Sequence, residues 1–365
     1  MEIRFFKTSE KELLLDSIRK LWNPNHIYVR NPAVLEHLVL NTPYRAGFSG
    51  VGNYSFLGIW ENDHVIGILG TIPQEINIIG KKGRSSTFTI WAVDKGKRGV
   101  CGLTFQEFLD TTGLDMKLAI GLSPMAYKIY NLLGWMVIED VPRWVAVNRV
   151  EETVKHLLPN DSTIPYLPRV IPCNLKTRYK IEIDTLNAKK WDRFYSSQFA
   201  PMTIGTCRDY KFLKWRYMDS PVLKYHFLTL SDEKEDCYGL AVVRIEHILD
   251  GRYRLGRILE FIAVEAEASI LLANAVVGFD PSVLMWDFYC LSDVTAFGLE
   301  AVGFRKIPVW MNKVMMPTRF QPVDYNHMKL NAAIWLSAQA KASLSPLSTY
   351  QWYITKGDAD QDRAN

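Results

Sequence analysis

The fold is decided by the stretch Ala119-Ile-Gly-Leu-Ser-Pro-Met-Ala-Tyr-Lys-Ile-Tyr-Asn-Leu-Leu-Gly-Trp135. Its apolar beginning, from Leu118 to Leu122, predicts a strand, and Ser123-Pro124 provides a helix N-cap followed by a first-turn proline. The next residues suit a short amphipathic helix, which Gly134 ends in the left-handed conformation. The stretch therefore predicts a strand, a short helix, a glycine stop and an aromatic residue, in that order.

The same order of signals recurs in the second half of the chain. Val283 to Tyr289 is another apolar run, and Ser292-Asp293 forms another cap. Gly303 then follows Ser292 at the spacing seen in the first copy, and Phe304 supplies the aromatic residue. Two copies of one supersecondary plan predict two domains of the same fold.

The segments between these copies predict an α+β fold, also describable as mixed α/β, because antiparallel hairpins precede strands that lead into helices. We expect a first domain over residues 1–150 and a proline-rich linker over 151–178. A second domain over 179–316 and a C-terminal helix and tail over 317–365 follow. The Ala-rich residues 330–342 predict that last helix.

The order of these elements resembles the last conserved block of the GNAT superfamily, the acyl-CoA-dependent N-acyltransferases. That block consists of a strand, a short helix carrying a tyrosine, and then glycine followed by an aromatic residue. The resemblance covers most of the chain as a tandem pair. It implies, for each half, a mostly antiparallel central sheet flanked by helices. It also implies acetyl-CoA or another acyl-CoA as the co-substrate.

Composition limits the other function classes. The 365 residues carry a net charge of only +4, with scattered basic residues, so no general nucleic-acid surface is expected. The five cysteines are far apart and have no histidine at ligand spacing, which predicts reduced thiols and no metal site. No apolar run reaches membrane-spanning length and no signal-peptide core follows Met1, so we expect a soluble cytoplasmic protein.

A candidate cofactor site lies in the first half. The strand expected over residues 86–93 leads into a basic, glycine-containing turn and then a helix, an arrangement that suits a pyrophosphate. It resembles the acyl-CoA signature of the superfamily, although Cys101 and Leu103 stand where glycine or alanine is more usual. The resemblance implies pyrophosphate contacts from Arg98, Gly99, Val100, Gly102 and Leu103, and pairing of Trp91, Ala92 and Val93 with the pantetheine arm.

The second half lacks this turn. Its corresponding strand runs through Glu265-Ala-Glu267 directly into a helix, with no glycine and with two carboxylates that repel a pyrophosphate. The second domain is therefore expected to hold the acceptor or to support the first domain, without binding CoA.

Acyl transfer to an amine requires a neutral amine, a stabilised oxyanion and a proton for the departing thiolate. Tyr130 occupies the position at which many members of the superfamily carry a thiolate-protonating tyrosine; packing against the sheet is the alternative role. Glu75, Asp94 and His26 are the candidates for the base. A water relay without a dedicated base is a further option.

Two more segments carry polar groups of interest. Phe212 to Pro221 resembles an element of tandem acyltransferase-like proteins from bacterial envelope polysaccharide clusters. In this segment Arg216 suits binding of a phosphate or carboxylate, and Trp215 or Tyr217 suits stacking on a sugar or base. The alternative role for Arg216 is a structural one, fixed in a domain interface. The acidic tail with Asp358, Asp360 and Asp362 either folds over the cleft or frays.

Three functions fit this pattern. The first is an acyl-CoA-dependent N-acyltransferase acting on the amino group of a nucleotide-activated or envelope-linked amino sugar. The second is a peptidoglycan bridge-forming transferase that takes aminoacyl-tRNA, for which no basic surface is evident. The third is a non-catalytic pair of GNAT-like domains that acts as a binding or scaffold protein. The oligomeric state is left open.

Overall fold

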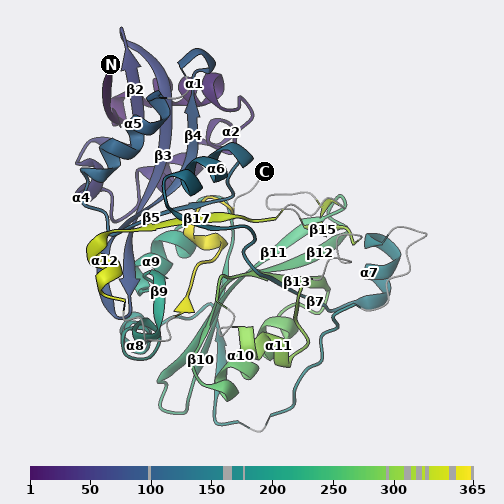
Figure 1. Cartoon of the computed structure of the whole chain (residues 1–365). Helices are drawn as coiled ribbons and strands as arrows, with labels where there is room; N and C mark the ends of the chain where they lie inside the picture. The colour runs from purple at the N-terminus through teal and green to yellow at the C-terminus, as the bar shows by residue number, and fades with distance from the viewer. Residues whose placement is uncertain are drawn as a thin grey trace.

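A computed structural model describes residues 1–97, 100–158, 167–175, 177–292, 296–307, 314–317, 323–324, 329–344 and 351–362. Two large mixed sheets, each flanked by helices, lie one beside the other, and the C-terminal segment runs between them (Figure 1). This architecture confirms the predicted α+β class. Arg98 and Gly99, two of the residues expected to bind the pyrophosphate, lie outside the described residues.

The first sheet has the order β1-β2-β3-β4-β5-β17-β6. All neighbours along it are antiparallel except β4 and β5, which are parallel. A short side branch, β9 with β18, pairs with the far end of β3. The strands are β1 (Glu2–Lys7), β2 (Asn53–Glu61), β3 (His64–Ile78), β4 (Lys81–Val93), β5 (Met116–Ile120), β6 (Met136–Ile138), β9 (Thr203–Thr206), β17 (Ala332–Leu336) and β18 (Gln351–Trp352).

The second sheet repeats this plan with the order β8-β10-β11-β12-β13-β7-β14. Again one central pair, β12 with β13, is parallel and the other neighbours are antiparallel. The strands are β7 (Arg143–Val147), β8 (Lys180–Ile183), β10 (His226–Ser231), β11 (Cys237–Ile248), β12 (Tyr253–Ala263), β13 (Val283–Tyr289) and β14 (Arg305–Lys306). A separate two-stranded ribbon joins β15 (Met316–Pro317) to β16 (Val323–Asp324).

Each sheet takes strands from both halves of the chain: β9, β17 and β18 of the second half belong to the first sheet, and β7 of the first half belongs to the second sheet. β17, near the C-terminus, lies between β5 and β6 in the first sheet, where the yellow strand crosses the blue half in Figure 1. Conversely, β7 from the first half lies between β13 and β14 in the second sheet. β17 and β7 hold equivalent positions in the two sheets, so neither sheet is built from one continuous half of the chain.

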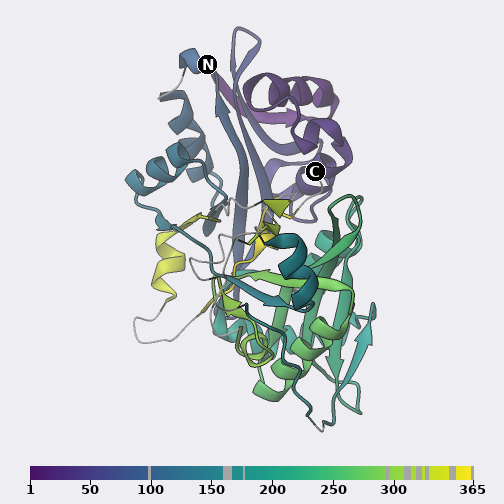
Figure 2. The same ribbon diagram turned by 90° about the vertical axis from the view of Figure 1, so that its right-hand side faces the viewer.

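Helices cover both faces of the first sheet. α1 to α3 pack on one face with Ile68 and Ile90, whereas α5 and α6 pack on the other with Leu69 and Phe88 (Figure 2). In the second half, α10 packs on β10, β11 and β12. The helices are α1 (Lys11–Leu21), α2 (Ile27–Arg30), α3 (Pro32–Val39), α4 (Ala46–Ser49), α5 (Val100–Asp110), α6 (Pro124–Leu132), α7 (Val150–Leu157), α8 (Ala188–Phe194), α9 (Tyr210–Leu213), α10 (Ala266–Gly278), α11 (Phe297–Ala301) and α12 (Ala338–Ala342).

One secondary-structure prediction is wrong. Residues 330–342 do not form a continuous helix: Ala332 to Leu336 is strand β17, Ser337 caps the next turn, and only α12 is helical. The unpaired edges of β5 and β6 provide hydrogen-bond partners on both sides of this segment. Such tertiary pairing overrides the helix propensity of alanine.

Candidate functional site

The parallel strands β4 and β5 diverge at the centre of the first sheet. They pair from Ser85 to Phe88 with residues Met116 to Ala119, and β5 then ends at Ile120. β4 continues from Thr89 to Val93 towards α5, hydrogen-bonded to β3 on one edge. Within the described residues no strand covers its other edge, so the N–H and C=O groups there are free to pair with an extended ligand.

A β-bulge marks the point of divergence. Trp91 pairs with Leu69 and Phe88 pairs with Thr71, so two residues of β4 oppose the single residue Gly70. A Cβ at position 70 would lie 2.3 Å from Oγ1 of Thr89, so glycine is required at this close approach. Bulges bend a strand and redirect its backbone groups. This bulge lies directly after the last residue of β4 that pairs with β5.

Trp91 lies next to two other residues of the predicted site, Tyr130 and Gly102. Its ring centroid lies 5.4 Å from that of Tyr130 on α6. A Cβ added to Gly102, in the first turn of α5, would lie 3.5 Å from the indole. Leu103, the next residue, is exposed. Trp91, Gly102 and Tyr130 are therefore brought together at the open edge of β4, with Ala92 and Val93 continuing that edge.

The described part of the segment between β4 and α5, residues 94–97, is rich in lysine. Asp94 accepts a hydrogen bond from the Gly96 N–H at 2.9 Å and so shapes the turn, which places Asp94 in a structural role. A 3₁₀ turn over Lys95–Lys97 follows, and α5 begins at Val100. Lys97 is ion-paired with Glu61 at 2.7 Å, so within the described part of this segment it is mainly Lys95 that favours an anion here.

Tyr130 is a buried phenol beside the divergence. Only 1% of its surface is exposed, and its ring also packs on Trp135 with centroids 4.3 Å apart. Burial raises the pKa of Tyr130 above its ordinary value, and Gln106 of α5 opposes that rise. The phenol is therefore protonated at neutral pH and can act as a proton donor.

Glu75 and His26, two of the base candidates, lie away from Tyr130. Glu75 is six residues along β3 from Leu69, the partner of Trp91, which corresponds to about 20 Å of strand. Its carboxylate binds Lys82 at 2.8 Å, and Lys82 also binds Asp209 at 2.9 Å.

His26 belongs to the opposite face of the first sheet. Its Nδ1 accepts a hydrogen bond from the Tyr28 N–H at 3.3 Å and caps α2. The ring is 5% exposed, and Tyr28 packs in the cluster that contains α1 and α3, while Tyr130 packs in the cluster of α5 and α6. The sheet thus separates His26 from Tyr130.

The Trp215-Arg216-Tyr217 segment lies inside the molecule. Nε1 of Trp215 donates to the His37 carbonyl at 3.0 Å, which ties the segment to α3. Arg216 donates to the backbone carbonyls of Gly357 and Ala359 at 2.8 and 2.9 Å. The Tyr217 hydroxyl donates to Glu260 on β12 at 2.5 Å. These contacts hold the C-terminal segment in place and occupy the groups that the sequence suggested for substrate.

The second sheet has the same divergence, but the chain itself fills it. β12 pairs with β13 only as far as Ile258 and also carries a bulge there, opposite Val242 and Val243. The Tyr353 hydroxyl accepts from the Phe261 N–H at 3.0 Å on the β12 side. On the β13 side, the Leu291 N–H donates to the Ile354 carbonyl at 3.0 Å. The position equivalent to the open edge of β4 is therefore occupied by the C-terminal segment.

Buried ion pairs fix that segment. Arg208 donates to Asp358 at 2.7 Å and to Glu260 at 2.8 Å, and all three side chains are fully buried. Farther along, Arg244 donates to Asp362 at 2.6 Å. The sequence pattern did not identify Arg208 or Arg244, because their partners in the C-terminal segment, Asp358 and Asp362, lie more than a hundred residues away and leave no local signal.

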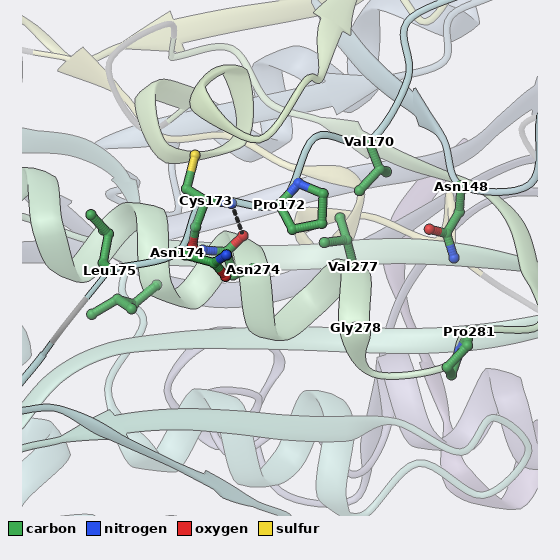
Figure 3. Close-up of a pocket in the computed structure, with 11 residues that line it drawn as sticks. Asn148, Val170, Pro172, Cys173, Asn174, Leu175, Asn274, Val277, Gly278 and Pro281 are labelled. Atoms are coloured by element: carbon green, nitrogen blue, oxygen red, sulfur yellow. Dashed lines mark hydrogen bonds between the residues drawn. The ribbon is translucent and has the colours of Figure 1, made fainter.

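A cavity of about 710 Å³ lies on the outer side of α10 (Figure 3). The strap of residues 170–175 forms one wall, held by paired hydrogen bonds of 2.9 and 2.7 Å between Asn274 and the backbone of Cys173. None of its lining residues is charged. The lining therefore offers no full positive charge to an anionic co-substrate.

Comparisons with known proteins bear on the fold. No protein-family model matches the chain, and no curated protein has a similar sequence. Among solved structures, a GCN5-related N-acetyltransferase from Anabaena variabilis ATCC 29413 matches 92% of this chain and 72% of its own, with 10% identity and a TM-score of 0.54. A conserved Enterococcus faecalis V583 protein, described as a probable N-acyltransferase, matches 79% of this chain with 14% identity and a TM-score of 0.51.

The chain has a two-domain GNAT-type fold. It spans 65% of the length of the Enterococcus protein, just under two thirds. At these identities the likeness concerns the fold alone. None of the helices in the described ranges is both long and apolar enough to cross a membrane. No cluster of three histidine, cysteine or acidic side chains suited to a metal ion occurs among the described residues.

Proposed function

We propose that the protein is an acyl-CoA-dependent N-acyltransferase whose co-substrate lies against the open edge of β4. The observation that carries this proposal is the contrast between the two divergences: the first is lined by Trp91, Gly102 and Tyr130, while the second is filled by residues of the chain. An extended pantetheine arm can pair with the free edge from Thr89 to Val93, as an added strand would.

The reaction in this arrangement is transfer of an acyl group from sulfur to nitrogen. The amine attacks the thioester carbonyl, the carbonyl oxygen gains negative charge, and the C–S bond then breaks. Tyr130 supplies a proton to the departing sulfur. Because Glu75 and His26 lie far from Tyr130 or across the sheet from it, we propose that water carries away the proton of the amine.

The acceptor class is the finer part of the proposal. We propose a primary amine, and specifically an amino sugar, on the basis of the sequence resemblance of the segment Phe212 to Pro221. The buried contacts of Trp215, Arg216 and Tyr217 give that segment a structural role and leave sugar recognition to other groups.

A charge placed at the start of α5 tests the co-substrate site. Gly102→Glu puts a carboxylate beside Trp91, where the expected pyrophosphate would be repelled. Because a Cβ there makes only ordinary contact, the variant is expected to fold. Thr111→Glu adds the same charge directly after the C-terminal end of α5 and serves as the control. Acetyl-CoA affinity should fall at least about tenfold in the first variant only; equal affinity in both would contradict the proposed site.

A further inference from the structure

Gln106 is a buried polar residue without an evident structural purpose. It lies on α5 with 7% of its surface exposed, and its Nε2 has no hydrogen-bond partner in the described part of the chain. Gly102, one turn earlier on the same helix face, meets the ring of Trp91, which in turn meets Tyr130. The amide of Gln106 therefore lies on the face of α5 that looks toward Tyr130 on α6.

The surroundings of this amide are apolar. Phe105 and Leu109 flank it on α5, and both belong to the same buried cluster as Leu69, Phe88 and Tyr130. A buried amide costs stability unless it is hydrogen-bonded, so the Nε2 of Gln106 calls for a partner within this cluster. The phenol of Tyr130 is a polar group of the same cluster.

We propose that Gln106 is the positioning residue of Tyr130: its Nε2 donates to the phenol oxygen and directs the O–H toward the sulfur of the acyl-CoA. This inference rests on the proposed function. A tyrosine oxygen that accepts a hydrogen bond from one side has its own proton free to be donated on the other. Gln106 thereby selects the direction in which the proton leaves.

The proton balance of the step follows from this geometry. The N–C bond forms, the C–S bond breaks, and the sulfur takes the proton of Tyr130. The tyrosinate that results is stabilised by the Gln106 N–H and regains a proton, through water, from the nitrogen of the new amide. Gln106 lowers the pKa of Tyr130 against the rise caused by burial, which is the effect a donor to the phenol oxygen must have.

The direct test replaces Tyr130 by a fluorinated tyrosine, whose phenol is more acidic, and follows its titration by ¹⁹F NMR. In Gln106→Leu, the pKa of this residue should rise by about one unit relative to the protein with Gln106. Glu107→Gln, an exposed change on the same helix, should leave it unmoved. An identical pKa in the Gln106→Leu protein would overturn the inference.

Stability and turnover provide a second readout. Gln106→Leu should change the melting temperature little, because it removes the buried amide together with its hydrogen bond to Tyr130, and should lower kcat about tenfold or more with unchanged acetyl-CoA affinity. A lower melting temperature with unchanged kcat would show a purely structural residue. Failure of the proposed function itself would look different: unmodified protein would not bind acetyl-CoA, whatever the titration of residue 130 showed.

Discussion

The indole of Trp91 and the phenol of Tyr130 lie with ring centroids 5.4 Å apart, at the point where β4 and β5 part. One ring comes from the open edge of the sheet and the other from the helix that follows β5. The pair thereby joins the free backbone edge of β4 to a protonated phenol. This juxtaposition suits a thioester, which needs both a strand-like partner for its arm and an acid for its sulfur.

Removing the phenol hydroxyl should affect turnover and leave binding unchanged. Tyr130→Phe is expected to lower kcat by about 10²- to 10⁴-fold, the usual contribution of a positioned acid, with unchanged acetyl-CoA affinity. Tyr127→Phe, three residues earlier on α6, is the matched control. Steady-state kinetics and calorimetry on both variants check this, and equal kcat values would exclude Tyr130 as the acid.

The C-terminal segment should contribute strongly to stability through its ion pairs. Asp358→Asn leaves Arg208 buried with one carboxylate fewer, and is expected to lower the free energy of unfolding by about 3–5 kcal/mol. Asp219→Asn breaks an exposed pair with Lys214 and should cost less than about 1 kcal/mol. Denaturant titrations of both variants compare the two; similar losses would contradict the structural role of Asp358.

Acid should destabilise the protein partly through Asp362. Burial alone would raise the pKa of this carboxyl, but Arg244 and Lys356 outweigh it and lower the pKa. Asp362 thus binds its proton more weakly when folded, and its stabilising effect is complete above the ordinary aspartate pKa of about 3.9 and lost as pH falls below it.

Asp362→Asn should therefore lower the melting temperature at pH 7 and weaken its dependence on pH between about 2 and 4. Melting curves across that range provide the measurement. A variant whose melting temperature falls with acid as steeply as that of the unmodified protein would show that other carboxyls dominate.

Much of the fold was accessible to sequence reasoning because the signals were local. The Ser123-Pro124 cap and the Gly134 stop act within a few residues, and the structure shows Ser123 accepting from the Ala126 N–H at 3.2 Å. The exchange of strands between the two sheets could not be predicted from the sequence. β17 has a helix-forming composition and becomes a strand only because β5 and β6 present unpaired edges.

In the candidate site, too, local sequence signals were predictive and long-range contacts were not. Trp91, Gly102 and Tyr130 follow from motif spacing, and the structure places them together. Gln106 carries no motif, and only the fold shows that its amide is buried and acts on Tyr130. Arg216 has a sequence context that suggests a ligand, but its partners, the carbonyls of Gly357 and Ala359, are far away in the chain.

The exchanged strands predict that the two halves depend on each other for folding. A fragment of residues 1–178 lacks β17, so the edges of β5 and β6 remain unpaired and β7 has no sheet to join. We expect this fragment to be aggregated or poorly folded alone, and to form a soluble complex when coexpressed with residues 179–365. A dispersed amide NMR spectrum from the isolated fragment would contradict this expectation.

The most direct test of the central claim is calorimetric titration of the protein with acetyl-CoA and with free CoA. We predict micromolar binding of acetyl-CoA at one site per chain, weakened in Gly102→Glu and retained in Thr111→Glu. Absence of binding up to millimolar acetyl-CoA, or binding that Gly102→Glu leaves unchanged, would contradict an acyl-CoA site at the divergence of β4 and β5.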